Sequence, residues 1–96
     1  MNLSELQNEI EMRWGSASYK KGVQHADHAC LHLMKALGKV SAMLEQTHHV
    51  DGDESDVSPQ IADLVICSAR LASILSIDLA EIVDKRLADK FPATRI

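Results

Sequence analysis

Aromatic residues are scarce in this sequence: Trp14, Tyr19 and Phe91 make up 3% of its 96 residues. Proline and glycine are also rare, with two and four copies. Because apolar residues still account for 46% of the chain, the core must be built from aliphatic side chains. An aliphatic core with few helix-breaking residues predicts an all-α fold. The length fits one domain of modest size, residues 1–96.

The chain also lacks an excess of positive charge and a long unbroken apolar run. Its formal net charge of −4 argues against binding to a nucleic-acid polymer. The most apolar segment, 58–79, is interrupted by serines and an arginine, so no membrane span is predicted. Cys30 and Cys67 lie among apolar residues without a CxxC pair, so we expect both to be buried, reduced thiols in a reducing compartment. Together with a polar, acidic N-terminal segment, these features predict a cytoplasmic protein.

Hydrophobic periodicity predicts four helices and no strand. The expected helices cover about 5–14, 24–46, 59–76 and 79–90, with an acidic loop at 47–57. Capping boxes are expected where Ser4 precedes Gln7 and where Asp78 precedes Glu81. A Ser-Pro pair marks the start of the third helix. The short connection between the last two helices favours antiparallel packing of that pair.

The third predicted helix is apolar around most of its circumference and carries one carboxylate, Asp63. A helix of this kind must be covered on nearly all sides, which three short partners in one chain cannot achieve. We therefore expect a homodimer, or a dimer of dimers, with this helix near the twofold axis. Asp63 is costly in such a place unless another group partners it.

The second predicted helix carries a row of histidines. His25, His28 and His32 are spaced to share one face, and His28 and His32 have the i, i+4 spacing that suits Zn²⁺ or Ni²⁺. The sequence favours the alternative interpretation, a solvated face that binds transition metals only adventitiously. Trp14 also has two interpretations, a core anchor or a surface on which a base stacks, and the core anchor is favoured.

Four segments together resemble one enzyme family, the MazG-like, all-α nucleoside triphosphate pyrophosphohydrolases. LSELQNEI (3–10) and LHLMKALGKVSAMLE (31–45) are similar to the first and second helices of that family. QIADLVICSARLASILSIDLAEIV (60–83) and KFP (90–92) resemble the third and fourth helices and the closing run. The resemblance implies a four-helix bundle that assembles as a dimer or tetramer. It also implies an ExxE and an ExxD carboxylate pair that hold Mg²⁺ while a nucleoside triphosphate is hydrolysed to the monophosphate and pyrophosphate.

In this sequence the four metal positions of the family fall on Ala36, Lys39, Gln60 and Asp63. Only Asp63 is acidic, so it is the one metal ligand that the motif retains, and no cofactor is expected. We expect Lys39 to form an ion pair with Asp63 in place of the metal. The candidate substrate-binding residues are Lys35, Lys39 and Trp14.

The sequence therefore predicts a MazG-like protein that has lost Mg²⁺-dependent catalysis and serves as a nucleotide- or protein-binding module. The alternative is a divergent but active nucleoside triphosphate pyrophosphohydrolase. Such an enzyme would use Mg²⁺, act on standard or modified nucleotides, and draw its metal ligands from Asp63 and acidic residues outside the usual motif.

Overall fold

The computed structural model describes residues 1–14, 22–49 and 56–92. Four helices follow one another along the chain: α1 (Leu3–Trp14), α2 (Gly22–His49), α3 (Ser58–Ile74) and α4 (Leu79–Lys90). The prediction of an all-α protein with four helices and no strand is confirmed for these ranges. The bounds differ most for α2, which extends past the expected 24–46 at both ends and takes up the first residues of the expected loop.

The first turn of α1 is capped two residues earlier than the sequence predicts. The Glu5 N–H donates to Asn2 Oδ1 (2.8 Å), and the Asn2 N–H donates to Glu5 Oε1 (3.2 Å). This is a capping box, because each side chain satisfies a backbone N–H that the helix leaves without a partner. The prediction of a Ser4–Gln7 box is therefore wrong, and the Gln7 side chain is available for contacts elsewhere.

Gln7 joins α1 to the connection between α3 and α4. Its Nε2 donates to the carbonyl of Ile77 (2.9 Å) and to Ser73 Oγ (3.3 Å). Its Oε1 accepts from the N–H of Leu79, the first residue of α4 (2.9 Å). All of these bonds are partly buried. Helix ends leave such backbone groups without intrahelical partners, so one side chain satisfies both ends of the connection at once.

The connection begins with a Schellman motif at the end of α3. The Ile77 N–H donates to the carbonyl of Ala72 (2.8 Å), and the Ser76 N–H donates to the carbonyl of Ser73 (3.1 Å). Ser76 has a φ of 58°, a left-handed conformation that glycine usually supplies in this motif. The motif ends α3 sharply and leaves the Ile77 carbonyl facing Gln7.

The next helix leaves this turn at a wide angle. Asp78 caps α4 as predicted, since its side chain accepts from the Glu81 N–H (3.2 Å). The chain bends by 109° between α3 and α4, so the prediction that these helices pack antiparallel is wrong. Within the described residues, no single helix has the length and apolarity to cross a membrane, although α3 and α4 pass that test when taken as one bent pair.

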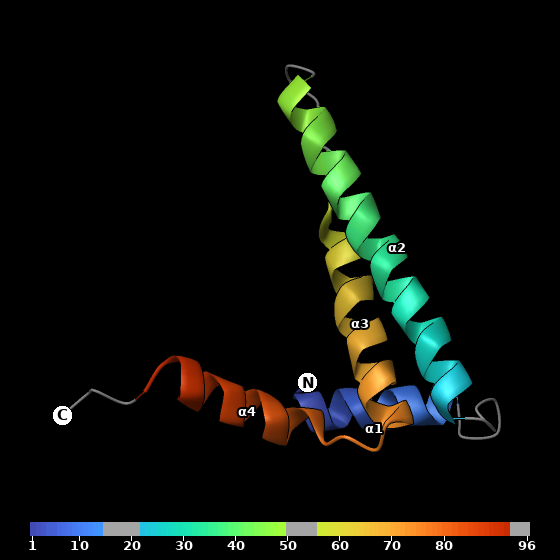
Figure 1. The fold of residues 1–96 in the computed structure, drawn as a ribbon, viewed down its shortest axis with the longest axis vertical. Coiled ribbons are helices and arrows are strands. Elements are labelled where there is room, and N and C mark those ends of the chain that lie inside the picture. The colour runs from blue at the N-terminus through green and yellow to red at the C-terminus, as the bar shows by residue number, and fades with distance from the viewer. Residues whose placement is uncertain (15–21, 50–55, 93–96) are drawn as a thin grey trace.

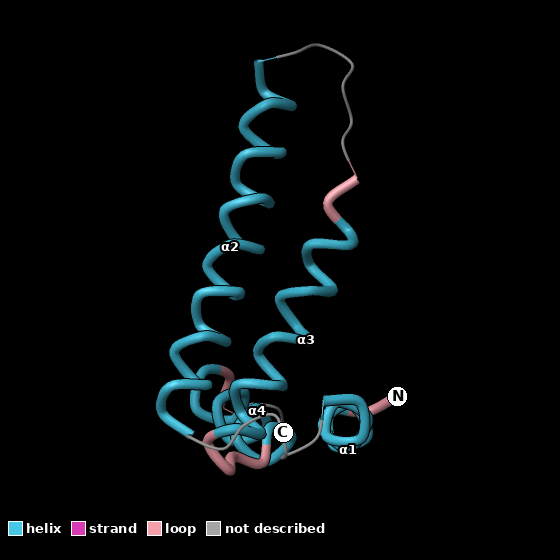
Figure 2. Tube along the Cα trace, turned by 90° about the vertical axis from the view of Figure 1, so that its right-hand side faces the viewer, coloured by secondary structure: helices cyan, strands magenta, loops and turns pink. Residues whose placement is uncertain are grey.

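The helices form two arms that meet at one end. α2 and α3 run side by side as a long hairpin, and α1 and α4 lie across its base (Figure 1). The perpendicular view places α2 and α1 on opposite sides of α3 (Figure 2). α1 contacts both α3 and α4, whereas α4 makes no contact with α2. Much of α2, α3 and α4 is therefore uncovered within one chain.

The buried core consists almost entirely of small side chains. Apart from Ile10, the buried apolar residues in the described part of the chain are all alanines: Ala26, Ala29, Ala36, Ala69 and Ala72. Small side chains let helix axes approach closely, which accounts for the α2–α3 and α1–α3 contacts. Other large aliphatic side chains are exposed, among them Leu31, Leu37 and Leu44 on α2, and α4 has no buried residue.

The protomer is more open than an independent domain of its length. Its radius of gyration is 16.5 Å, whereas a compact chain of this length has about 12.5 Å. Its accessible surface is 7423 Å², against roughly 5,500 Å² expected for a folded monomer of this mass. Exposed large side chains on three helices contribute to the difference, among them Leu37, Leu44, Ile61, Val65, Leu87 and Phe91.

We predict that Gln7→Ala lowers the free energy of unfolding by about 1–3 kcal/mol, because it leaves partly buried backbone groups of Ile77 and Leu79 without partners. Urea denaturation at fixed protein concentration measures this loss. Gln46→Ala is the matched control, since Gln46 is exposed on α2 and its removal should change stability by less than about 0.5 kcal/mol. Equal stability of the two variants would contradict the role of Gln7.

Candidate functional site

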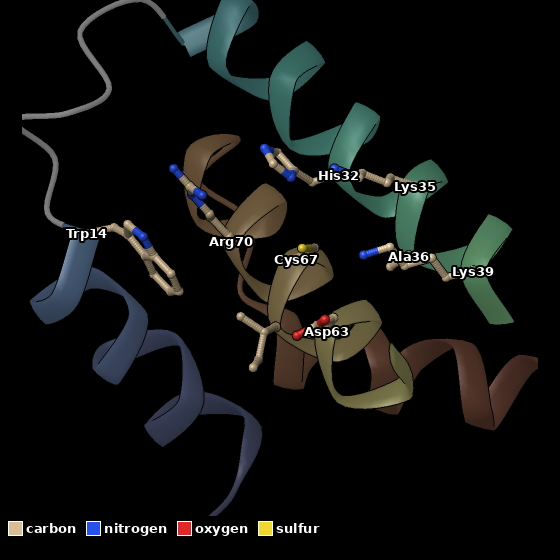
Figure 3. Close-up of a pocket in the computed structure, with 9 residues that line it drawn as sticks. Trp14, His32, Lys35, Ala36, Lys39, Asp63, Cys67 and Arg70 are labelled. Carbon is tan, nitrogen blue, oxygen red and sulfur yellow. The ribbon is translucent and has the colours of Figure 1, made fainter. Parts of the chain in front are cut away.

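A pocket of about 380 Å³ lies where α1, α2 and α3 meet. Figure 3 shows its side chains converging from the three helices. Trp14 at the end of α1 forms one wall. The other lining residues come from α2 and α3: His32, Lys35, Ala36, Lys39, Asp63, Ile66, Cys67 and Arg70.

Each long helix contributes one face to this pocket. The α2 residues recur at i, i+3, i+4 and i+7 from His32, and the α3 residues recur in the same way from Asp63. Buried Ala36 lies at the α2 side of the pocket and keeps the two helices close. The structure thus brings together three of the four motif positions named from the sequence, which are Ala36, Lys39 and Asp63. Both predicted substrate-binding lysines and Trp14 also line the pocket.

The fourth motif position, Gln60, does not line the pocket. Its Oε1 is buried and has no hydrogen-bond partner among the described residues. The four motif positions therefore offer one carboxylate to this space, from Asp63, and the Lys39 ammonium group lines the same pocket. Mg²⁺ requires an oxygen-rich, near-octahedral set of ligands, so these residues do not fit that ion. Elsewhere in the described ranges, no group of three or more His, Cys, Asp or Glu side chains is placed to hold a metal.

The predicted ion pair between Lys39 and Asp63 is wrong. Both side chains are exposed and line the pocket, but the structure forms no ion pair between them. Arg13 and Glu9 form a surface ion pair within α1 (2.8 Å). A separated Lys39 and Asp63 remain accessible to a molecule that enters the pocket.

Arg70 and Trp14 make the pocket's most distinctive contact. The Arg70 guanidinium lies over the Trp14 ring, 5.0 Å from its centroid, in a cation–π arrangement. Burial lowers the pKa of Arg70 from its ordinary value. Trp14 is 40% exposed, so the prediction that it anchors the core is wrong. The sequence did not single out Arg70 as a site residue, although its position seven residues after Asp63 puts both on one face of α3.

Cationic groups outnumber acidic ones in this pocket. Lys35, Lys39 and Arg70 face a single carboxylate, that of Asp63. The chain as a whole has a net charge of −4, so the pocket is a local positive region on an acidic protein. Charge of one sign in a concave site concentrates ligands of the opposite sign. The arrangement therefore favours an anionic ligand.

The histidine pair predicted from the sequence is in contact. His28 and His32 are both exposed on α2, and their Nε2 atoms lie 3.0 Å apart. His32 also lines the pocket, whereas His28 does not. The pair is therefore at the rim of the site, one helical turn from Lys35.

We predict that Cys67 is alkylated by iodoacetamide more slowly than Cys30 near pH 7.5. Burial, with a smaller effect of the Asp63 carboxylate, raises the pKa of the Cys67 thiol, which lowers its thiolate fraction at that pH. Cys30 is exposed on α2, so the prediction that both cysteines are buried is wrong for this residue, and it serves as the reference within the same molecule. Mass spectrometry of the two peptides over time gives both rates, and equal rates would contradict the partial burial of Cys67.

No protein-family model, curated protein or solved structure matches this chain. The likeness to MazG-like enzymes therefore depends on the sequence segments that carry it. Independently of that likeness, the pocket geometry brings Ala36, Lys39 and Asp63 into one site.

Proposed function

We propose that this protein is a MazG-like nucleotide-binding module without pyrophosphohydrolase activity. The observation that carries the proposal is the composition of the pocket between α1, α2 and α3. It combines three cationic side chains, Lys35, Lys39 and Arg70, with an indole ring. A nucleotide has the matching chemistry, since its phosphates are anionic and its base is a flat aromatic surface.

The dimensions of the pocket support a ligand of this size. Small-molecule sites commonly measure about 300–1,000 Å³, and this pocket has a volume of about 380 Å³. The lysines extend from exposed positions on α2, where they can reach phosphate oxygens without losing their contact with water. Trp14 and Ile66 provide apolar surface for the base. Inorganic phosphate would use only the lysine part of the site.

Because the motif positions lack most of the carboxylates that would hold Mg²⁺, we expect the protein to bind a nucleotide without hydrolysing it. In a metal-dependent pyrophosphohydrolase, Mg²⁺ neutralises the triphosphate and activates the attacking water. In this protein, Lys39 supplies positive charge at a motif position, and Ala36 supplies no ligand. A lysine neutralises phosphate charge but does not generate a metal-bound hydroxide. We therefore expect a bound nucleotide to leave the protein unchanged.

The proposed binding is tested by calorimetric titration with ATP, AMP and inorganic phosphate, in the presence of a chelator. We predict that ATP and AMP bind more tightly than inorganic phosphate, and that Lys39→Glu weakens ATP binding by about tenfold or more. Lys85→Glu is the matched control, because Lys85 is exposed on α4 and outside the pocket. It should change the affinity little.

Two outcomes would contradict the proposal. Equal losses in Lys39→Glu and Lys85→Glu would indicate non-specific attraction of anions. Release of pyrophosphate from nucleoside triphosphates with Mg²⁺, abolished by Asp63→Ala, would show that the protein is an active pyrophosphohydrolase. Far-ultraviolet circular dichroism of each variant checks that the helices are retained.

We also propose that the protein assembles as a homodimer, with α3 near the twofold axis. The protomer has roughly 1,900 Å² more surface than a folded monomer of its mass. Covering such an area on each of two copies gives an interface in the range of about 2,000–5,000 Å² that obligate homodimers bury. On α3, Ile61 and Val65 are 50% and 46% exposed, and they lie on a different face from the pocket residues Asp63 and Cys67. A partner on this face would leave the pocket open.

We predict that sedimentation at micromolar concentration gives the mass of a dimer. Val65→Lys should shift the protein toward monomer, because burying an unpaired ammonium in an apolar interface is costly. Met12→Lys is the control, since Met12 is 80% exposed on α1 and lies away from buried Ile10. A monomeric wild-type protein would contradict the assembly, and dissociation of both variants alike would contradict the assignment of the interface to α3.

A further inference from the structure

His28 and His32 form a pair whose geometry the nucleotide proposal does not use. They lie one turn apart within α2, a helix that continues well beyond them in both directions. Their rings are 4.6 Å apart between centroids and inclined by 75°, and their Nε2 atoms are separated by 3.0 Å. Both side chains are exposed, so a solvated ion can reach them.

We propose that His28 and His32 form a two-nitrogen site for a late first-row divalent metal ion, of which Cu²⁺, Ni²⁺ and Zn²⁺ are the candidates. Imidazole nitrogens bind these ions at about 2.0–2.1 Å. Two nitrogens 3.0 Å apart then subtend about 91–97° at the metal. That is close to the angle between neighbouring positions of an octahedral or square-planar ion, so the spacing of the nitrogens suits the metal once the rings turn to direct both lone pairs at it.

The site selects among metals by the chemistry of its ligands. Neutral imidazole suits Ni²⁺, Cu²⁺ and Zn²⁺, whereas Mg²⁺ prefers oxygen ligands and keeps its water. The histidine pair should bind Cu²⁺ more tightly than Ni²⁺ or Zn²⁺. This separates the histidine pair from the Mg²⁺ site that the sequence resemblance implied around Asp63.

Without a metal, the two rings satisfy one another by a hydrogen bond between the Nε2 atoms, in which one neutral imidazole donates and the other accepts. A metal replaces that bond once the donor ring carries its proton on Nδ1 in place of Nε2, so that each Nε2 offers a lone pair and both rings stay neutral. Lys35, one turn beyond His32, repels cations, but it is exposed and the repulsion is screened by salt. The remaining metal positions are open to water, or to an anion in the pocket that His32 lines.

The metal site does not depend on the proposed nucleotide binding and is tested with the metal alone. Untagged full-length protein, freed of metal with a chelator and dialysed, is titrated calorimetrically with Ni²⁺. This ion is used because, unlike Cu²⁺, it does not readily oxidise the exposed thiol of Cys30. We expect one ion per chain, with His28→Ala and His32→Ala each weakening binding on the order of a hundredfold, because the second nitrogen of a chelate binds intramolecularly.

The double variant His48→Ala/His49→Ala is the matched control, since it removes two imidazoles from the same helix without touching the pair. It should retain the wild-type affinity. A loss in this control that equals the loss in His28→Ala would overturn the site, as would Ni²⁺ binding that survives both His28→Ala and His32→Ala. Thermal unfolding with and without Ni²⁺ gives a second readout. The metal should raise the Tm of the wild type and of the control, but not that of His32→Ala.

Discussion

The hydrogen bonds of Gln7 are the constraint on which the arrangement of this protein depends. α1 and α3 lie far apart in the sequence but contact one another in the fold. Gln7 fixes their relative position by bonding to Ile77 and Leu79, the two sides of the α3–α4 turn. With α1 held across the base of the hairpin, Trp14 is placed against Arg70 on α3. One polar side chain thus sets both the direction of α4 and the wall of the pocket.

The second constraint is the size of the residues between the helices. Alanines at the α2–α3 and α1–α3 contacts allow close approach, so the lysines of α2 and the Asp63 face of α3 meet in one pocket. Several large aliphatic side chains, such as Leu37, Val65 and Leu87, remain exposed on α2, α3 and α4. A core of alanines buries little apolar area per residue, so a single protomer gains little hydrophobic stabilisation. The close packing of helices on alanines therefore accounts for both the pocket and the exposed apolar surface. The proposed dimer would cover that exposed surface.

Much of this arrangement could be predicted from the sequence. The four helices follow from periodicity, and the grouping of Ala36, Lys39 and Asp63 follows from the resemblance to the MazG-like metal motif. The role of Gln7 could not be predicted, because it depends on an N-terminal cap that moved to Asn2 and on a turn 70 residues away. Ser and Asn are similarly favoured at the N-cap, and Glu and Gln both serve three residues later, so the sequence does not decide between the two capping boxes.

Predictions about individual side-chain contacts were less successful, because such contacts depend on how the helices are placed relative to one another. The Lys39–Asp63 ion pair was inferred from the motif positions of the two residues, which indicate that two groups share a pocket but not that they touch. Trp14 was expected in the core because large aromatics usually are buried, yet the last turn of α1 leaves it 40% exposed beside Arg70. Both errors concern the distance between elements, which spacing along the chain does not determine.

The central claim is that the pocket between α1, α2 and α3 holds a nucleotide. The most direct test is alkylation of Cys67 with and without ATP, because this thiol lines the pocket while Cys30 is exposed outside it. The account predicts that ATP slows the modification of Cys67 in proportion to occupancy and leaves the rate at Cys30 unchanged. Unchanged rates at both thiols, at ATP concentrations that saturate binding, would place the nucleotide elsewhere and contradict the account.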